Sequence, residues 1–367
     1  MEYNINFVDG LRFELINDGF PDSDRKYDIS FVEIGTNRVI YKDQIGNNMW
    51  CATKSRIFHC YIILQYRGRT VKQISVPKEM KGKRILINFD STSLGDNLAW
   101  MPYCELFQKQ FDCETLVCTH RNEFFEGNYP TLTFVPPKMT IPDLFGIVSI
   151  GWYWDYYKES TNPVTIPLQE TAARALCVPF EELVPRINFT AKPRPIEQKY
   201  VCISVKSTSG CKEWDYWQEL VDMLIADGYA VTEISKQEDD SYKGFKQSSL
   251  KGITKLDAYD LASVQNAIHH SEFMIGLSSG LSWLAWAMKK NVVMIANFSE
   301  EWHEFKTNCI RITNKNVCHG CWNDPRFKIN SSDWSWCPIN EHTSKAFECN
   351  KAISAKDVYE QIKRELF

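Results

Sequence analysis

The chain has 367 residues, with 42 Lys and Arg against 46 Asp and Glu, a net charge of -4 and 44% hydrophobic residues. This length is typical of two or three domains with true cores, so disorder, collagen and coiled coil are excluded. A mildly acidic chain without a block of Lys or Arg also argues against nucleic acid or an anionic membrane surface as the main partner, because such binding rests on neutralising phosphates.

The 13 cysteines are the feature of the composition that needs an explanation. The first residues have neither the basic start nor the apolar core of a secretion signal, and no apolar run approaches the about 20 residues of a membrane span. We therefore expect a cytosolic protein without a membrane span. In a reducing cytosol, cysteines are metal ligands, catalytic thiols or small core residues before they are disulfides, and an odd number cannot pair completely.

Residues 1–81 are predicted to form a small N-terminal β-domain, because short β-rich segments alternate there with Asn and Gly turn signals. The pattern then changes to alternating strand and helix, which predicts a parallel α/β sheet and a first Rossmann-like acceptor domain over 82–190. The expected strand, helix and strand of this domain lie at 84–89, 97–109 and 115–118.

A proline-rich stretch at 185–197 predicts an extended linker, and a second Rossmann-like domain is expected over 191–308. Its expected strands lie at 200–205, 230–234, 273–277 and 292–296, and its expected helices at 214–227, 260–270 and 282–289. Residues 309–350 have little apolar periodicity and several cysteines, which favours a metal finger, and 351–367 are assigned to a C-terminal helix. The predicted fold class is α/β, with two Rossmann-like domains, the β-domain and a metal-binding insertion.

Two strand-to-helix junctions carry candidate chemistry. In the first, Asp96 ends the sequence Ser-Leu-Gly-Asp where a helix begins. A capping carboxylate is the ordinary interpretation of such an Asp, and a general base facing the cleft is the functional one. The second junction has backbone N–H groups at a helix start that suit a pyrophosphate, although small-residue turns also occur without ligands. Its candidate donor-binding residues are Ser278, Ser279, Gly280 and Leu281.

The loop after the strand at 200–205 supplies further candidates for the donor site. Lys212 is placed to hold a nucleotide phosphate as a point charge, while the alternative is a solvated lysine. Ser207 and Thr208, in the same loop, are candidate substrate-binding residues.

A Cys-x₂-Cys pair followed by two further cysteines predicts a tetrahedral Cys₄ metal site. The ligands are Cys318, Cys321, Cys337 and Cys349. Thiolates select zinc or iron, and the spacing does not choose between them. Four thiolates leave no open coordination position, so the predicted role is structural. The other nine cysteines are predicted to be core residues, and surface positions are expected for His303, His319 and His342.

Taken in order, these parts resemble the heptosyltransferase-like glycosyltransferases of GT-B type, and among them the bacterial autotransporter heptosyltransferases. The segment 85–103 is similar to their first-strand motif, 162–189 to their interdomain segment, and 211–214 and 275–284 to their two donor-binding loops. The resemblance covers nearly the whole chain. Each motif is short, so the order of the parts carries more weight than any one of them.

The resemblance implies an enzyme that transfers heptose from ADP-heptose, with inversion, to serines of an autotransporter passenger domain. It implies Asp96 as the base, Lys212 and the helix start at Ser279 as the groups that stabilise the leaving diphosphate, ferric iron in the Cys₄ site, and assembly into a large ring. Zinc stays open as the alternative metal. One departure concerns the donor: lipopolysaccharide heptosyltransferases usually have Asp-Thr-Gly-Leu-x-His at the last loop, where this chain has Ser278 and Trp283.

Three other functions stay open at this point. Transfer to a lipopolysaccharide core is one, although the β-domain and the Cys-rich segment argue against it. A non-catalytic sugar-nucleotide-binding or assembly protein is the second. A redox or metal sensor built on the Cys₄ site is the third, and it predicts reversible switching on metal removal, whereas a structural metal predicts loss of the fold.

Overall fold

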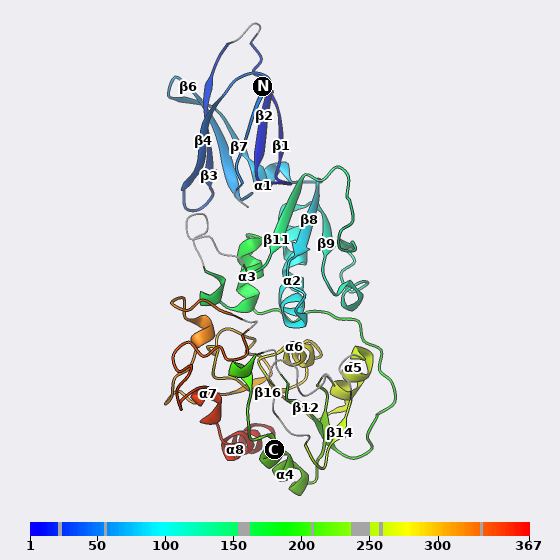
Figure 1. Cartoon of the computed structure of the whole chain (residues 1–367). Helices are drawn as coiled ribbons and strands as arrows, with labels where there is room; N and C mark the ends of the chain where they lie inside the picture. The colour runs from blue at the N-terminus through cyan, green and yellow to red at the C-terminus, as the bar shows by residue number, and fades with distance from the viewer. Residues whose placement is uncertain are drawn as a thin grey trace. The chain divides into compact units, whose positions relative to one another are not determined.

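The computed structural model of the chain describes residues 1–20, 24–54, 57–152, 162–206, 209–235, 250–256, 260–330 and 333–367 (Figure 1). The chain forms two compact units. The first consists of residues 1–92, 100–160 and 171–180, and the second of residues 93–99, 161–170 and 181–367. Among the described residues, every helix is too short or too polar to cross a bilayer.

The first unit opens with two antiparallel sheets, of order β1-β2-β5 and β4-β3-β6-β7. Their strands are β1 (Glu2–Asn6), β2 (Arg12–Asn17), β3 (Tyr27–Glu33), β4 (Val39–Ile45), β5 (Met49–Ala52), β6 (Cys60–Tyr66) and β7 (Arg69–Ser75). Successive side chains of these strands point to opposite faces of the sheet. In β3, for example, Tyr27, Ile29 and Phe31 are buried, whereas Asp28 is exposed. The predicted antiparallel β-domain is confirmed.

A parallel sheet of order β10-β9-β8-β11 follows in the same unit. Its elements are α1 (Val76–Glu79), β8 (Arg84–Phe89), most of α2 (Leu94–Phe111), β9 (Glu114–Cys118), η1 (Asn122–Phe124), β10 (Leu132–Phe134), β11 (Gly146–Ile150) and most of α3 (Leu168–Ala175). The short helix η2 (Pro163–Thr165) and the first residues of α2 and α3 belong to the second unit. The predicted strand, helix and strand at its start are confirmed. Two strands, β10 and β11, were not predicted, because each is short and follows irregular chain.

Phe7 joins the β-domain to this parallel sheet. Its N–H donates to the carbonyl of Phe145 at 2.8 Å, and its own carbonyl accepts from the N–H of Ile147 at 3.2 Å. The ring stacks on Phe58, with the ring centroids 5.4 Å apart. A Cβ on Gly146 would lie 2.0 Å from the Phe7 ring, so this strand position requires glycine. The contact is therefore a close-packed joint between two sheets of one unit.

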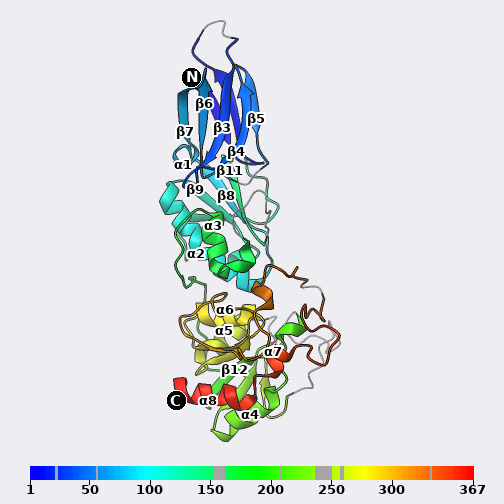
Figure 2. The ribbon, with the colours of Figure 1, turned by 90° about the vertical axis from the view of Figure 1, so that its left-hand side faces the viewer.

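The second unit is built on a six-stranded parallel sheet of order β14-β13-β12-β15-β16-β17. Its elements are β12 (Tyr200–Ser204), η3 (Gly210–Lys212), α4 (Trp217–Ala226), β13 (Ala230–Glu233), β14 (Thr254–Lys255), α5 (Leu261–His270), β15 (Met274–Leu277), α6 (Gly280–Ala287), β16 (Val292–Ile295), β17 (Cys309–Ile312), η5 (Cys321–Asn323), α7 (Glu348–Lys351) and α8 (Ala355–Leu366). All residues of β12, β15 and β16 are buried, as expected for parallel strands covered on both faces. Helices α4 and α8 lie side by side against this core (Figure 2).

The sheet extends further along the chain than the sequence predicted. Strand β17 pairs in parallel with β16, although its residues were assigned to the metal finger. The irregular, cysteine-rich segment therefore begins after Ile312, and we use the name finger segment for residues 313–350. The chain then enters α8, whose start is a capping box in which Ser354 and Asp357 satisfy each other's backbone N–H.

We predict that Gly146→Ala weakens the joint at Phe7. The added methyl group must displace the Phe7 ring, at a cost of about 2 kcal/mol for overpacking in a filled core. The variant should therefore melt several degrees below the natural protein in a thermal scan of the whole chain. Ser149→Ala, on the same strand at a half-buried position, is the matched control and should leave the melting temperature nearly unchanged. Equal melting of the Gly146→Ala variant and the natural protein would contradict this interpretation of the joint.

Candidate functional site

The carboxyl ends of the central strands of the second unit meet at one edge of the sheet. Register places Ser204 of β12 opposite Gly276 of β15, and Leu277 of β15 opposite Ile295 of β16. In open parallel sheets this edge is where ligands bind. The loops that leave it carry most of the residues singled out in the sequence.

The start of α6 lies at this edge and is packed without spare room. A Cβ on Gly276 would lie 2.6 Å from the Ser282 hydroxyl, which itself donates to the carbonyl of Leu277 at 2.6 Å. Ser279 is the N-cap residue, yet its side chain makes no capping hydrogen bond. Its Oγ is buried and has no hydrogen-bond partner among the described residues. The helix start thus combines backbone N–H groups with a polar atom that the described protein does not satisfy, which suits an anionic ligand.

Asp96 lies close to this helix start. It is the third residue of α2 and is buried, so it does not occupy the N-cap position itself. Residues 93–99 belong to the second unit, where glycines allow α2 and α6 to meet. A Cβ on Gly280 would lie 3.0 Å from the Leu94 Cβ and 3.2 Å from the Gly95 nitrogen. The structure therefore brings Asp96 and the predicted phosphate-binding turn together.

Trp283, one of the two departures noted in the last predicted donor loop, is a packing residue. Its side chain is buried, and its ring meets Phe305 edge-on at 4.9 Å between the centroids. A Cβ on Gly95 would lie 3.1 Å from the Trp283 Cδ1. The indole therefore supports the turn that carries Asp96.

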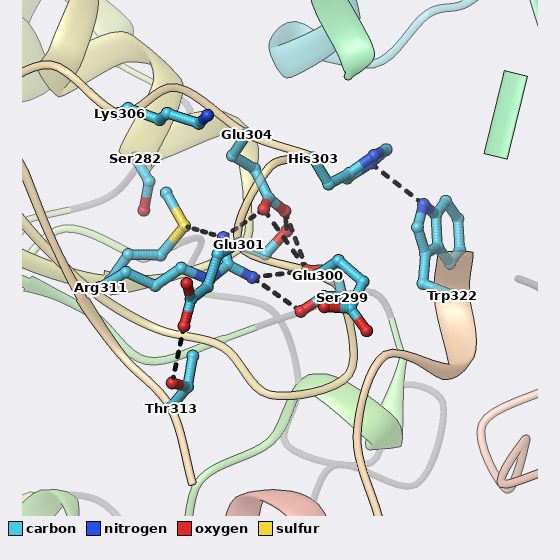
Figure 3. A network of polar contacts seen from close by, with 12 residues as sticks. Ser282, Ser299, Glu300, Glu301, His303, Glu304, Lys306, Arg311, Thr313 and Trp322 are labelled. Carbon is cyan, nitrogen blue, oxygen red and sulfur yellow. Dashed lines mark hydrogen bonds and ion pairs between the residues drawn. The ribbon is translucent and has the colours of Figure 1, made fainter. Parts of the chain in front are cut away.

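A buried polar network includes Ser278, the residue before the N-cap of α6. Figure 3 shows its members Ser299, Glu304 and Arg311. Ser278 Oγ donates to Glu304, and so does Ser299 Oγ, at 3.2 Å. Arg311 forms an ion pair with Glu304 and donates to the Ser299 carbonyl at 3.0 Å. Glu304 comes from the loop after β16 and Arg311 from β17, so the network ties together the ends of three strands. The Ser278 hydroxyl is used within the protein, and the role predicted for Ser278 rests on its backbone.

The electrostatics of this network hold Glu304 ionised. Burial alone would raise the pKa of this carboxyl, but the Arg311 charge, His303 and the hydrogen bond from Ser278 together lower the pKa to about 2. His303 is also buried, at 5% exposure, so its predicted surface position was wrong. Burial lowers the pKa of His303, and its Nε2 accepts a hydrogen bond from the Trp322 indole at 3.1 Å.

Lys212 ends the short helix η3, in the loop that follows β12. Its ammonium lies 5.0 Å from the centre of the Phe298 ring and 5.6 Å from that of Trp322. These are cation–π distances, so the side chain is held rather than simply solvated. Ser207 and Thr208, the other candidates in this loop, lie outside the described residues.

Glu304 and Arg311 were not predicted from the sequence. A signal for Arg311 was present: it is the one charged residue in the strand sequence Cys-Ile-Arg-Ile, and a charge in a parallel strand needs a buried partner. The partner itself lies in an irregular loop seven residues away. No periodicity marks such a position.

The finger segment brings the predicted metal ligands near one another. Besides burial, the neighbouring Cys318 and Cys337 raise the pKa of Cys321, and Cys318 acts in the same direction on Cys349. Asn340 Nδ2 donates to the Cys318 sulfur at 3.2 Å, a contact typical of thiolate ligands. In the described part of the chain, no three His, Cys, Asp or Glu side chains are arranged to hold a metal ion. The donor set nevertheless fits a thiolate-bound metal, because four soft ligands lie in one small segment with polar partners for sulfur.

Comparison with known proteins matches residues 148–333 to glycosyltransferase family 9 (heptosyltransferase). The chain is 34% identical over 292 residues to the autotransporter heptosyltransferase Aah of Escherichia coli, which covers 76% of this chain and 73% of Aah. It is 30% identical to the inactive autotransporter heptosyltransferase BimC of Burkholderia thailandensis, over 98% of this chain and 86% of BimC. The chain belongs to the autotransporter heptosyltransferases of glycosyltransferase family 9.

A solved structure of this heptosyltransferase family extends the likeness to the fold. The iron-containing dodecameric glycosyltransferase TibC of enterotoxigenic E. coli superimposes with a TM-score of 0.85 at 27% identity, covering 99% of this chain and 95% of TibC. A structure of TibC in complex with ADP-D-β-D-heptose gives a TM-score of 0.83 at 26% identity, with the same coverage. The predicted GT-B fold with an N-terminal β-domain is therefore confirmed.

We predict that Glu304→Gln destabilises the protein by about 3 kcal/mol at neutral pH, because it leaves Arg311 buried without a negative partner. The pKa of Glu304 is lower in the folded state than its ordinary value of 4.5, so its contribution is present above about pH 4.5 and is lost as the pH falls toward 2. Thermal scans of both proteins at pH 7, 5, 4 and 3.5 should show a gap that is constant at the upper two values and narrows below them. A gap independent of pH would contradict the assignment of a depressed pKa to Glu304.

Proposed function

We propose that this chain transfers heptose from ADP-heptose to serine hydroxyls of a bacterial autotransporter, within the cytoplasm. The observation that carries the proposal is the likeness along 99% of the chain to TibC, whose structure has been solved with ADP-D-β-D-heptose. The local geometry supports it, since the buried Asp96 carboxylate, the start of α6 and the held Lys212 belong to one unit, and the last two follow strand ends of its sheet.

Asp96 is the proposed general base. It accepts the proton of the serine hydroxyl as the oxygen bonds to the anomeric carbon of the sugar. The bond from that carbon to the diphosphate oxygen breaks, and ADP leaves with the electron pair. Attack opposite the departing group inverts the anomeric centre. General-base assistance of this kind contributes about 10²–10⁴-fold to the rate.

The leaving diphosphate needs positive charge where its own charge develops. The N-terminus of α6 supplies backbone N–H groups and the Ser279 hydroxyl, while Lys212 supplies a full cation. The proposed contacts of Gly280 and Leu281 are through the backbone. The aromatic rings of Phe298 and Trp322 restrict the lysine, so less side-chain freedom is lost when a phosphate binds.

The cysteines of the finger segment are the proposed ligands of a structural metal. Ferric iron is proposed because TibC is described as iron-containing, with zinc as the alternative that the same thiolates accept. Cys318, Cys321, Cys337 and Cys349 would hold it. Four thiolates close the coordination shell, so the metal would cross-link a segment that has little core of its own and take no part in transfer.

Assembly of several copies is also proposed. TibC is described as dodecameric. The described β-domain of this chain exposes large apolar side chains, including Val39, Met49, Trp50 and Val71. An exposed apolar surface on a small domain is typical of an interface.

A second function, a non-catalytic sugar-nucleotide-binding protein, is favoured by the likeness to BimC, which carries the description inactive. Transfer to a lipopolysaccharide acceptor has less support. The likeness to TibC, an autotransporter heptosyltransferase, covers 99% of this chain and so includes its N-terminal β-domain. Activity measurements separate the three.

We predict that Asp96→Asn and Lys212→Ala each abolish transfer of a heptose to a co-expressed autotransporter passenger domain. Asparagine keeps the shape of Asp96 but cannot accept the proton, and alanine removes the cation beside the diphosphate. Intact-mass spectrometry of the passenger domain measures the added sugar, and peptide mapping locates the serines.

The controls remove charge away from the site. Glu105→Gln, on the same helix as Asp96, and Lys251→Ala, at an exposed position, should leave transfer unchanged. Near-normal transfer by Asp96→Asn would refute the assignment of the base. If the natural protein binds ADP-heptose but transfers no sugar, the result would favour the non-catalytic sugar-nucleotide-binding function. If it transfers heptose to a lipopolysaccharide acceptor and not to the passenger domain, the result would favour a lipopolysaccharide heptosyltransferase.

We predict that Cys318→Ser or Cys349→Ser removes the bound metal. Elemental analysis of the natural protein should find one iron for each chain, and both variants should fall well below that ratio because serine is a poor ligand for iron or zinc. Cys309→Ser, at a half-buried cysteine on β17, is the control and should keep the metal. A full complement of metal in the Cys318→Ser variant would exclude this set of ligands. Zinc instead of iron in the natural protein would identify zinc as the structural metal.

A further inference from the structure

The finger segment is attached to the rest of the second unit largely by asparagine side chains. Asn297, at the end of β16, donates to the carbonyls of Asn314 and Cys349, each at 3.0 Å. Asn314 donates to the Ala352 carbonyl at 2.9 Å, and Asn323 donates to the Val164 carbonyl at 2.7 Å. Side-chain amides thus take over the backbone bonding that regular elements would supply.

Asn350 differs from these others in what it bonds. Its Nδ2 donates to the carbonyl of Cys211 at 2.7 Å and to that of Glu213 at 2.9 Å. These two residues flank Lys212. Asn350 is only 1% exposed, and its Oδ1 has no partner among the described residues. The Asn350 amide nitrogen therefore donates to the carbonyls of the residues immediately before and after the lysine.

Other contacts hold the same turn from the finger segment. The Gly210 N–H donates to the Trp334 carbonyl at 3.2 Å. Trp322, next to Cys321, lies beneath the Lys212 ammonium and donates its indole N–H to His303. The backbone of Lys212 is thus fixed by Asn350, and its side chain by an aromatic ring of the same segment.

We propose that Asn350 is a positioning residue for Lys212, so that the finger segment sets the geometry of the donor-phosphate site. This inference rests on the proposed function, in which Lys212 binds the diphosphate. The two carbonyl contacts fix the direction in which the lysine leaves the turn. Without them the ammonium must be ordered when the ligand binds, and affinity falls by the cost of that ordering.

The experiment is a double-mutant cycle on ADP binding, measured by titration calorimetry on the metal-loaded protein. Lys212→Ala and Asn350→Ala are each expected to raise the Kd for ADP about tenfold, the order of one or two lost hydrogen bonds or one phosphate contact. Once Lys212 is absent, Asn350→Ala should have little further effect, because there is no ammonium left to position. Affinity for adenosine, which has no phosphate, should be the same in the natural protein and the Asn350→Ala variant.

Asn314→Ala is the matched control. It removes a 2.9 Å hydrogen bond from a side-chain amide to a backbone carbonyl, as Asn350→Ala does, but the carbonyl is that of Ala352 and not one beside Lys212. The Kd for ADP should therefore stay unchanged. Metal content is measured for every variant, so that loss of the metal is not mistaken for loss of positioning. If Asn350→Ala does not fold, Asn350→Ser, whose side chain cannot reach both carbonyls, takes its place.

The outcomes separate the two proposals. Non-additive effects of Lys212→Ala and Asn350→Ala, with unchanged adenosine binding, support the positioning role. Additive effects, or equal losses for ADP and adenosine, overturn it and leave the role of Lys212 standing. An unchanged Kd in Lys212→Ala overturns both the positioning role and the phosphate contact on which it rests.

Discussion

A buried ion pair, Glu304 with Arg311, is the interaction on which the geometry of the candidate site depends. A charged side chain is stable in the interior only when it has an oppositely charged partner and its remaining hydrogen bonds are made. Here two serine hydroxyls donate the remaining hydrogen bonds to the Glu304 carboxylate. Because the partners come from β17 and from the loops that follow β15 and β16, the pair fixes the distances between the strand ends. The start of α6 inherits that rigidity, since Ser278 is both a member of the network and the residue before the N-cap.

The finger segment poses the opposite problem, because it has few regular elements to satisfy its backbone. Short polar side chains solve it: the amides of Asn297, Asn314, Asn323 and Asn350 reach carbonyls that no helix or sheet occupies. Such bonds hold only while the chain around them is fixed. A thiolate-bound metal would supply that fixed point, and Asn350 would carry its effect to the loop of Lys212. The proposed metal site and the proposed phosphate site would then belong to one framework, with no role proposed for the metal in the reaction.

The fold was largely predictable because parallel strands buried on both faces are apolar runs between small-residue turns, as at 84–89 and 200–204. Strand β17 was missed because Arg311 interrupts its apolar pattern, and the burial of Arg311 depends on a carboxylate from the irregular loop before the strand. Asp96 and the α6 start could be proposed from the sequence because strand-to-helix junctions are visible locally. Asn350 was not, since its significance depends on a contact with residues about 139 positions earlier in the chain. Local pattern shows where a site lies, but not which long-range bonds shape it.

The departure at the last donor loop can now be explained in physical terms. The resemblance to the lipopolysaccharide heptosyltransferases implies an Asp where this chain has Ser278, and a buried carboxylate lies beside this position because Glu304 accepts the Ser278 hydroxyl. The charge of Glu304 is balanced by Arg311, so the proposed phosphate site does not face an unpaired negative charge there. Trp283 replaces a polar ring by an apolar one that supports Gly95 and the turn of Asp96. In this structure the side chains of Ser278 and Trp283 are thus both used within the protein, the first in a hydrogen bond and the second in packing.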